Sequence, residues 1–230
     1  MKINVFLPCK KNSQRVKNKN KRKFAYINSN LIKIKLTQLL KAKLINKIYL
    51  STNDSQIILF AKKLKSKKII IHVRKDKSLS TSSTRTQKLV DHAMNIIPDG
   101  HILWTHVTSP FIDEKIYDGA IKKYKKIIRS KYYDSLMSVS KIKGFVWDDK
   151  KSINYNYKKA KWPKTQDIKP LNKINSGIFL NSRLNYFKFK NRIGKKPYMY
   201  ELPRYFGTDI DDNDDFYLAE FLFKNKKKYK

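Results

Sequence analysis

The most concentrated set of acidic side chains in this sequence lies near its C-terminal end. The chain has 53 basic and only 18 acidic residues, yet five of the acids fall in one short stretch: Asp209, Asp211, Asp212, Asp214 and Asp215. On an extended segment Asp209 and Asp211 lie on the same side, because side chains alternate. This pair suggests a site for a divalent cation such as Mg²⁺, which prefers oxygen ligands. The alternative is a capping turn before a helix, which residues 212–215 could provide alone.

A second set of chemically suitable side chains follows the first apolar run, residues 3–7. Residues 8–20 form a polar, cation-rich segment that follows a predicted strand. Its backbone amides, the Ser13 hydroxyl and several cations would converge where a polyphosphate can bind. The cations in question are Lys10, Arg15 and Lys19. The segment lacks the glycines of a Walker loop or a dinucleotide fingerprint, which argues against both. The alternative interpretation is a basic surface loop.

These segments need a scaffold, and the hydrophobic pattern indicates one. Short apolar runs alternate with segments of helical periodicity over most of the first 140 residues. We expect strands over residues 3–7, 47–51, 68–73, 101–106 and 135–139. We expect helices over residues 31–43, 55–64, 85–97 and 113–128. The alternation predicts an α/β fold with a mostly parallel, twisted sheet and helices on both faces.

The predicted sheet indicates where a ligand would bind. In open α/β sheets, ligands bind beyond the carboxyl ends of the strands. Four polar segments occupy that edge in this chain: residues 8–20, 51–54, 74–86 and 106–110. We therefore expect the chemistry of this protein to take place where these four segments meet.

The alternating pattern breaks between about residues 143 and 174. This stretch is lysine-rich, has no periodicity, and holds the aromatic side chains of Phe145, Trp147 and Trp162. The pattern resumes with strands expected over residues 175–180 and 198–202 and a closing helix over 214–223. We interpret residues 143–174 as an arm inserted into a single domain spanning residues 1–230. Exposed aromatic residues on an arm often bury against a second subunit, so we expect a homodimer.

The net charge of +35 raises the question of a nucleic-acid partner. Of the 53 basic residues only 8 are arginine, the residue on which base recognition most depends. We interpret the lysine excess as compositional drift on solvated faces, with nucleic acid as an unlikely partner. The single cysteine, Cys9, excludes a disulfide framework and a multi-cysteine zinc site. No apolar run is long enough to span a bilayer, so we expect a cytoplasmic protein without a membrane partner.

Seven short motifs, in order along the chain, resemble the CMP-sialic acid synthetase (acylneuraminate cytidylyltransferase) family. The first is Leu-Pro-x-Lys-x-Asn-Ser-x-Arg-Val-x-Asn-Lys-Asn, which starts at Leu7. The others are Ser51–Asp54, Arg74 with Leu79–Thr81, Thr108–Phe111, Asp134–Val139, Asn175–Phe179, and Asp209–Asp211 with the residues up to Glu220. Two departures stand out. Cys9-Lys10 replaces the family's Ala-Arg, and His106 replaces a glutamine found in many members.

The resemblance implies a Rossmann-like nucleotide-diphospho-sugar transferase fold. It also implies a cytidylyltransferase that joins CTP to a nonulosonic, sialic-acid-like sugar and releases pyrophosphate, with Mg²⁺ or another divalent cation as cofactor. Asp209 and Asp211 would bind the metal, and the catalytic residues would be Lys10, Arg15, Lys19 and Asp211. The residues expected to bind CTP are Lys10, Ser13, Arg15, Lys19, Asn20, Arg74, Thr84 and Thr86. The residues expected to bind the acidic sugar are His106, Thr108, Ser109 and Asn175.

Two alternative functions remain open from the sequence. The nearer one is the related synthetase that makes CMP-Kdo from an eight-carbon sugar acid. The Lys19-Asn20 pair and the Asn175-Ser176-Gly177 segment favour the nonulosonate branch over it. The other alternative is a non-catalytic, basic nucleic-acid-binding protein on an inherited fold. The intact Asp209 and Asp211 pair favours the enzyme.

Overall fold

The computed structural model describes residues 1–226, and residues 227–230, the end of the predicted domain, lie outside the described residues. Within the described part, seven strands form one sheet in the order β5-β4-β1-β6-β8-β7-β9. The strands are β1 (Ile3–Cys9), β4 (Lys47–Thr52), β5 (Ile69–Val73), β6 (His101–Trp104), β7 (Ser135–Ile142), β8 (Leu171–Ser182) and β9 (Pro197–Glu201). Neighbouring strands are parallel except where β8 pairs with β6 and with β7. The predicted α/β fold with a mostly parallel sheet is confirmed.

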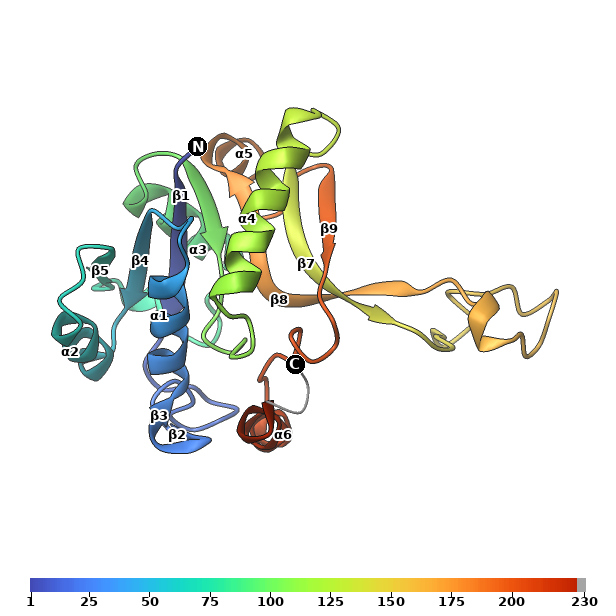
Figure 1. Cartoon of the computed structure of the whole chain (residues 1–230), viewed down its shortest axis with the longest axis horizontal. Coiled ribbons are helices and arrows are strands. Elements are labelled where there is room, and N and C mark those ends of the chain that lie inside the picture. The colour runs from blue at the N-terminus through green and yellow to red at the C-terminus, as the bar shows by residue number, and fades with distance from the viewer. Residues whose placement is uncertain (227–230) are drawn as a thin grey trace.

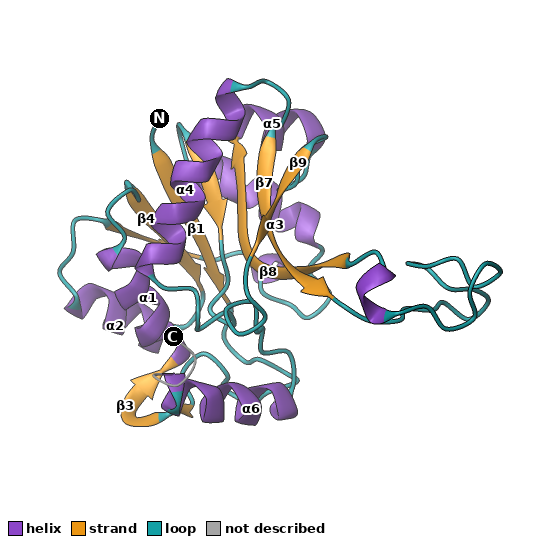
Figure 2. Ribbon diagram, turned by 45° about the vertical axis from the view of Figure 1, so that its right-hand side comes forward, coloured by secondary structure: helices purple, strands orange, loops and turns teal. Residues whose placement is uncertain are grey.

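Helices cover both faces of this sheet, as Figures 1 and 2 show. Side chains of α1 (Leu31–Lys41), α2 (Ser55–Lys63) and α4 (Glu114–Arg129) pack in one core. Side chains of α3 (Thr86–Ile96) and α5 (Arg183–Phe189) pack in a second core on the other face. Strand β1 serves both, because Val5 and Leu7 enter the first core while Phe6 enters the second.

The last helix, α6 (Asn213–Lys224), lies beyond the carboxyl ends of the strands, next to a short β2–β3 hairpin (Lys23–Phe24 and Tyr26–Asn30) (Figure 2). Phe24 of the hairpin packs edge-to-face against Phe216 and Phe223 of α6. The hairpin and α5 have no counterpart in our predictions. The hairpin has strands too short for alternation to show, and α5 buries only Tyr186 along its length, so neither leaves a periodic signal.

Residues 143–170 project far from the sheet, as Figure 1 shows. Strands β7 and β8 run out together to support them, pairing Val139 with Ile174 and Ile142 with Leu171. Strand β8 therefore begins at Leu171, so the last residues of the predicted arm belong to the sheet ribbon rather than to the arm's tip. At the tip Phe145 stacks on Trp162, with ring centroids 4.2 Å apart, and Trp162 remains 78% exposed.

Within residues 1–226, none of the helices combines the length and the apolar character that crossing a bilayer would require. Two short 3-10 helices complete the fold, η1 (Lys77–Leu79) in the segment after β5 and η2 (Thr165–Asp167) in the arm.

Candidate active site

The carboxyl ends of β1 and β6 open onto a cavity of about 310 Å³. The segment after β1 forms one wall, and the segment after β6 forms another. Its lining residues are Pro8, Cys9, Lys10, Ser13, Gln14, Arg15, Lys19, Asn20, Ser82, His106, Val107 and Thr108. The structure thus brings together in one cavity the predicted phosphate-binding segment and two of the residues predicted to bind the sugar. Ser82 also lines this cavity and was not predicted.

The Ser51–Asp54 motif holds the backbone of the phosphate-binding segment in place. The side-chain oxygen of Asn53 accepts a hydrogen bond of 2.8 Å from the Lys11 amide. The buried carboxylate of Asp54 forms a 2.9 Å ion pair with Lys21 and also caps α2. Two adjacent residues that follow β4, Asn53 and Asp54, therefore hold this segment near its start and just past its end.

Asn20 closes this segment on itself. Its side-chain amide donates to the carbonyl of Lys10 over 3.2 Å, while its own carbonyl accepts from the Ile32 amide at the start of α1. Asn12 and Asn18 adopt left-handed backbone angles, with φ of 59° and 54°, which asparagine tolerates better than most residues. The asparagines of the first motif therefore shape the backbone that surrounds the cavity.

The cations of the segment point toward different partners. Lys10 donates to the carbonyl of Thr81 over 3.3 Å, and Arg15 forms an exposed 2.9 Å ion pair with Asp211. Lys19 donates to the carbonyl of Ile210 over 2.6 Å. Burial lowers the pKa of Lys19, and the nearby carboxylates of Asp211 and Asp209 oppose that shift. Arg15 and Lys19 therefore join the first segment to the acidic stretch near the C-terminus.

The acidic stretch divides into two parts with different roles. Asp212 and Asp215 form a capping box at the start of α6. The helix cap is therefore present, and it leaves Asp209 and Asp211 as the candidate metal ligands. Asp209 and Asp211 line a second cavity of about 570 Å³, which Asp215 of the capping box also lines. Burial raises the pKa of Asp209, and the neighbouring Asp211 raises it further, while a hydrogen bond from the Thr108 side chain lowers it.

The Asp209 and Asp211 pair fits a divalent cation that also binds phosphate. Within residues 1–226, no lysine, arginine or histidine nitrogen pairs with the Asp209 carboxylate. When a half-buried carboxylate lies beside a second carboxylate, a nearby cation stabilises the charged form of both. The described side chains provide no group of three or more acidic, histidine or cysteine ligands. Mg²⁺, which commonly combines one or two carboxylates with substrate phosphates and water, is the cation that matches this donor set.

Asn175 lies on β8 beside the same second cavity. It is buried, and its side-chain oxygen accepts from the Ser138 hydroxyl over 2.6 Å while its amide donates to the Ser140 hydroxyl over 3.2 Å. Gly207 passes close by, since a Cβ there would lie 2.8 Å from the Asn175 amide nitrogen. This close approach needs a glycine. Asn175 and Thr108 therefore line different cavities, although both were predicted to bind the sugar.

Three residues predicted to bind CTP do not line either cavity. The guanidinium of Arg74 is buried and donates to the Ser51 hydroxyl, the Ser51 carbonyl and the Leu79 carbonyl over 2.7–2.9 Å. Thr84 donates to the carbonyl of Ser78, and Thr86 is the first residue of α3. The structure places Arg74 and Thr84 where they hold residues 77–84 against the sheet, next to Lys10 and Ser82.

Ser109 is buried, and its hydroxyl faces neither cavity. Its carbonyl accepts a 2.7 Å hydrogen bond from the Lys35 amine. Lys35 is fully buried and also donates to the Tyr117 hydroxyl over 2.7 Å, and Tyr117 bonds to Thr105 in turn. Burial lowers the pKa of Lys35 to about 7. Our predictions did not include Lys35, although a lysine on the apolar side of a predicted helix is a detectable signal.

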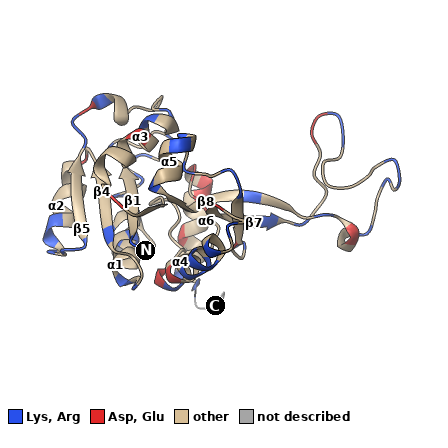
Figure 3. Cartoon of the chain, turned by 90° about the horizontal axis from the view of Figure 1, so that it is seen from above, with Lys and Arg blue, Asp and Glu red and all other residues tan. Residues whose placement is uncertain are grey.

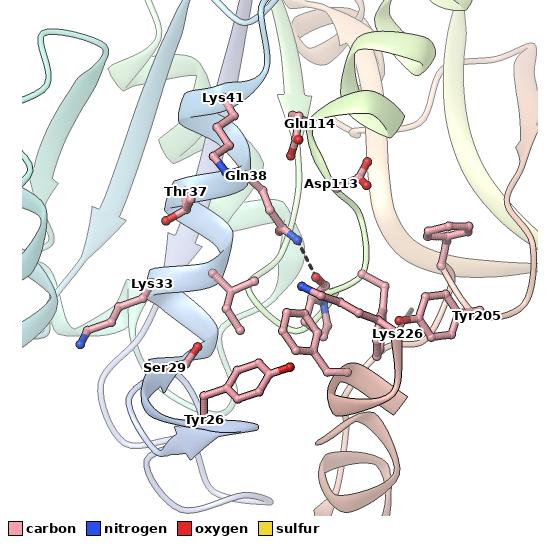
Figure 4. A pocket seen from close by; sticks show the side chains of 15 residues that line it. Tyr26, Ser29, Lys33, Thr37, Gln38, Lys41, Asp113, Glu114, Tyr205 and Lys226 are labelled. Atoms are coloured by element: carbon pink, nitrogen blue, oxygen red, sulfur yellow. Dashed lines mark hydrogen bonds between the residues drawn. The ribbon is translucent and has the colours of Figure 1, made fainter. Parts of the chain in front are cut away.

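A separate cavity of about 420 Å³ lies between α1, the β2–β3 hairpin and α6, as Figure 4 shows. Gln38 on α1 spans it and donates to the carbonyl of Pro110 over 2.6 Å. None of the residues predicted to bind CTP, metal or sugar lines it. The candidate active site is therefore the pair of cavities at the carboxyl ends of the strands.

Comparison with known proteins agrees with this location. The sequence matches the profile of the cytidylyltransferase family over residues 5–228. The chain is a member of that family. The N-acylneuraminate cytidylyltransferase of Escherichia coli O18:K1:H7 (strain RS218 / NMEC) is 22% identical over 235 residues, covering 100% of this chain and 54% of the relative. This cytidylyltransferase thus spans about half the length of that relative.

Solved structures show the same fold at low sequence identity. CMP:2-keto-3-deoxy-manno-octonic acid synthetase complexed with CTP superimposes with a TM-score of 0.67 at 12% identity, covering 98% of this chain and 100% of the other. The 2-C-methyl-D-erythritol 4-phosphate cytidylyltransferase of Francisella tularensis gives 0.63 at 13% identity, covering 96% and 99%. The predicted nucleotidyltransferase fold is therefore confirmed for this cytidylyltransferase.

Proposed function

We propose that this cytidylyltransferase transfers CMP from CTP to an acidic nonulosonic sugar. The main support for this proposal is that residues lining one cavity bond to the stretch that lines the other. Arg15 and Lys19 line the cavity after β1, and their partners Asp211 and Ile210 belong to the stretch that lines the second one. A cationic compartment for a triphosphate thereby meets a compartment that is lined by three aspartates and has room for a second substrate.

The reaction is an in-line substitution at phosphorus. The anomeric hydroxyl oxygen of the sugar attacks the α-phosphorus of CTP, the bond from that phosphorus to the α–β bridging oxygen breaks, and pyrophosphate leaves with the electron pair. The hydroxyl proton passes to solvent. Lys10, Ser13, Arg15 and Lys19 would hold the phosphates, since fixed cations and positioning provide most of the catalysis in phosphoryl transfer. Asn20 would contact the cytidine part, and Arg74, Thr84 and Thr86 would contact or support it.

Asp209 and Asp211 would hold Mg²⁺ in this proposal. The ion, when bound, neutralises charge on the phosphates and polarises the α-phosphate. Thr108 would orient Asp209 through its hydrogen bond, while Arg15 would exchange its exposed contact with Asp211 for a contact with phosphate. That exchange needs no backbone movement, because both side chains are exposed.

Support for the choice of sugar comes from the N-acylneuraminate cytidylyltransferase relative, which aligns with the whole of this chain. His106, Thr108 and Asn175 would contact the sugar, and the buried Ser109 would hold the adjacent Thr108 in position. The eight-carbon acid named for the structurally similar synthetase is the second candidate, because that enzyme aligns over nearly the full length of both chains. Both candidates share a carboxylate next to the attacking hydroxyl.

The direct test is release of pyrophosphate. The protein is incubated with CTP, Mg²⁺ and, separately, several nonulosonic acids and the eight-carbon acid. We expect release with CTP and a nonulosonic acid, and not with ATP or without metal. Release with the eight-carbon acid alone would select the second candidate. No release with any sugar acid, under conditions in which the protein remains folded, would overturn the proposed function.

We further propose that the arm, residues 143–170, binds a second copy of the chain. The observation in support is its exposed apolar group: Trp147, Ile153, Tyr157 and Trp162 are all more than 40% exposed. A projecting segment with this much exposed apolar surface is typical of an interface. Light scattering after size exclusion should give a dimer, and Trp162→Ala combined with Trp147→Ala should shift it to monomer. A monomeric wild-type protein at tens of micromolar would contradict this.

A further inference from the structure

His106 occupies an unusual position at the end of β6. One of its ring nitrogens, Nε2, contacts two donors at once: the Trp104 indole N–H at 3.0 Å and the Arg192 guanidinium at 3.1 Å. An indole N–H and a guanidinium can only donate hydrogen bonds. The Nε2 atom must therefore carry its lone pair, and the proton of a neutral His106 ring must sit on Nδ1.

The Nδ1 atom remains available to a ligand. Across residues 1–226, no hydrogen bond to Nδ1 of His106 is present, and Nδ1 does not belong to the buried, unpartnered side-chain atoms. His106 itself lines the cavity of about 310 Å³ beside Thr108 and Lys19. The ring thus turns its acceptor nitrogen to the protein and, within the described part of the chain, leaves its N–H donor free in a residue that lines the cavity.

Arg192 is built into the protein as the fixed partner of this ring. It follows α5, and its guanidinium lies over the ring of Phe179 at 3.9 Å and over the ring of Trp104 at 5.2 Å. In the described part of the chain no carboxylate lies within ion-pairing distance of it. An arginine stays protonated at any ordinary pH, so it donates to His106 constantly.

We propose that Arg192 is a positioning residue that fixes His106 as the Nδ1–H tautomer, so that His106 donates a hydrogen bond to an acceptor oxygen of the acidic sugar. The identity of the ligand, an acidic sugar, rests on the proposed function. The assignment of the tautomer does not depend on it. The other ring tautomer would present a bare nitrogen to the cavity and would repel an oxygen. Arg192 therefore acts on substrate selection through the ring, without touching the reacting atoms.

The electrostatic surroundings agree with a neutral ring. Burial is the main cause that lowers the pKa of His106, and the charges of Arg192, Lys35 and Lys19 lower it further, to about 3. The ring is thus uncharged over the whole range in which the protein would act. A neutral donor is retained at every working pH, unlike the behaviour of an exposed histidine.

The first test observes the tautomer directly, without any activity. Nitrogen-15 spectra of histidine-labelled protein, with His106 assigned by its loss in His106→Gln, should show a protonated Nδ1 and an unprotonated Nε2 from about pH 5 to about pH 9. Arg192→Met should mix the two tautomers, Arg192→Lys should restore the wild-type pattern, and Lys190→Met in the same loop should leave it unchanged. A protonated Nε2 in the wild-type protein would overturn the inference, whether or not Arg192→Met folds.

The second test uses turnover. Arg192→Met should raise the KM for the acidic sugar about tenfold, the effect of one lost hydrogen bond, and leave the KM for CTP unchanged. Arg192→Lys should recover most of this loss. An unchanged sugar KM in Arg192→Met would refute the positioning role. If no sugar acid reacts while the tautomer is as expected, the proposed function fails and the assignment of the tautomer stands.

Discussion

The two sides of the candidate active site are held in place by different means. On the nucleotide side, the segment after β1 is fixed by short polar side chains from neighbouring motifs, such as Asn53 and Asp54. On the sugar side, the residues near the cavity are fixed by long cationic side chains from distant parts of the chain, Lys35 and Arg192. Short polar side chains therefore hold the first segment on the nucleotide side, and the buried cations Lys35 and Arg192 hold residues of the sugar side.

This difference has a physical meaning for specificity. The nucleotide side keeps its own cations, Lys10 and Arg15, directed at weak or exposed partners that a triphosphate can replace. On the sugar side, Lys35 and Arg192 are already engaged with a carbonyl oxygen and a ring nitrogen, so these two cations act on selectivity by orienting neutral groups. Other lysines are distributed over the helices and the arm, as Figure 3 shows, and Lys141, Lys143 and Lys173 line the second cavity.

The largest effect should come from the residue that contacts both sides, Asp211. Asp211→Asn should lower kcat roughly a thousandfold, corresponding to the several kcal/mol of charge stabilisation that a metal supplies. The unfolding midpoint should stay close to wild type, because Asp211 is exposed. Asp214→Asn, in the first turn of α6, is the matched control and should retain full activity. Full activity in Asp211→Asn would remove the metal assignment.

On the nucleotide side, Arg74→Met should affect folding more than catalysis. It removes three buried hydrogen bonds to Ser51 and Leu79 and should lower the free energy of unfolding by about 2–4 kcal/mol. Urea titration measures this directly, and Arg85→Met, an exposed neighbour, should show little change. A normal unfolding free energy with a raised KM for CTP would instead assign Arg74 to the nucleotide.

On the sugar side, Gly207→Ala should disturb Asn175. The new Cβ would collide with the Ser140 hydroxyl and the Asn175 amide, forcing a shift of a few tenths of an ångström or more. We expect the KM for the sugar to rise about tenfold, within the 1–3 kcal/mol that overpacking costs. The KM for CTP should not change. Gly144→Ala is the control, since a Cβ there meets no atom within 4 Å. Equal effects on both KM values would contradict the division into two sides.

The smallest effect concerns Lys35, whose pKa of about 7 lies below its value of about 10.4 in an unfolded chain. Between these two values the unfolded chain binds more protons, so stability should rise with pH, by at most about 1.4 kcal/mol per pH unit. Urea unfolding at a series of pH values measures the rise, and Lys35→Met should abolish that part of it. Lys41→Met on the same helix should not. Identical slopes in wild type and Lys35→Met would show that Lys35 stays charged when buried.

Sequence reasoning succeeded where neighbouring residues carry the signal. The order of strands and helices and the cap at residues 212–215 follow from local pattern, while the metal role of Asp209 and Asp211 stays a prediction. The same reasoning placed residues 51–54 at the ligand-binding edge of the sheet, and the structure adds that Asn53 and Asp54 hold the backbone of the first segment while Asp54 caps α2.

Sequence reasoning failed where residues far apart in the chain converge. Arg192 has no local feature that separates it from the other basic residues, and only the packing of Trp104 and Phe179 shows its partner, His106. Lys35 could have been found, because it interrupts an apolar helix face. Nothing in the sequence context of Arg74 reveals that its guanidinium donates to Ser51 and Leu79, and its role in binding CTP stays a prediction.

The position of β8 has a consequence for how the chain reaches this fold. Strand β8 inserts between β6 and β7, although it follows both in the sequence. During synthesis the edge of β6 has no native partner until residues up to Ser182 have emerged from the ribosome. The edge of β6 is covered only after the whole arm and β8 have been synthesised, although the first four strands of the sheet are complete long before. We therefore expect a late strand insertion to limit the co-translational assembly of this protein, and we expect its nascent chain to carry an exposed edge of the kind that promotes aggregation.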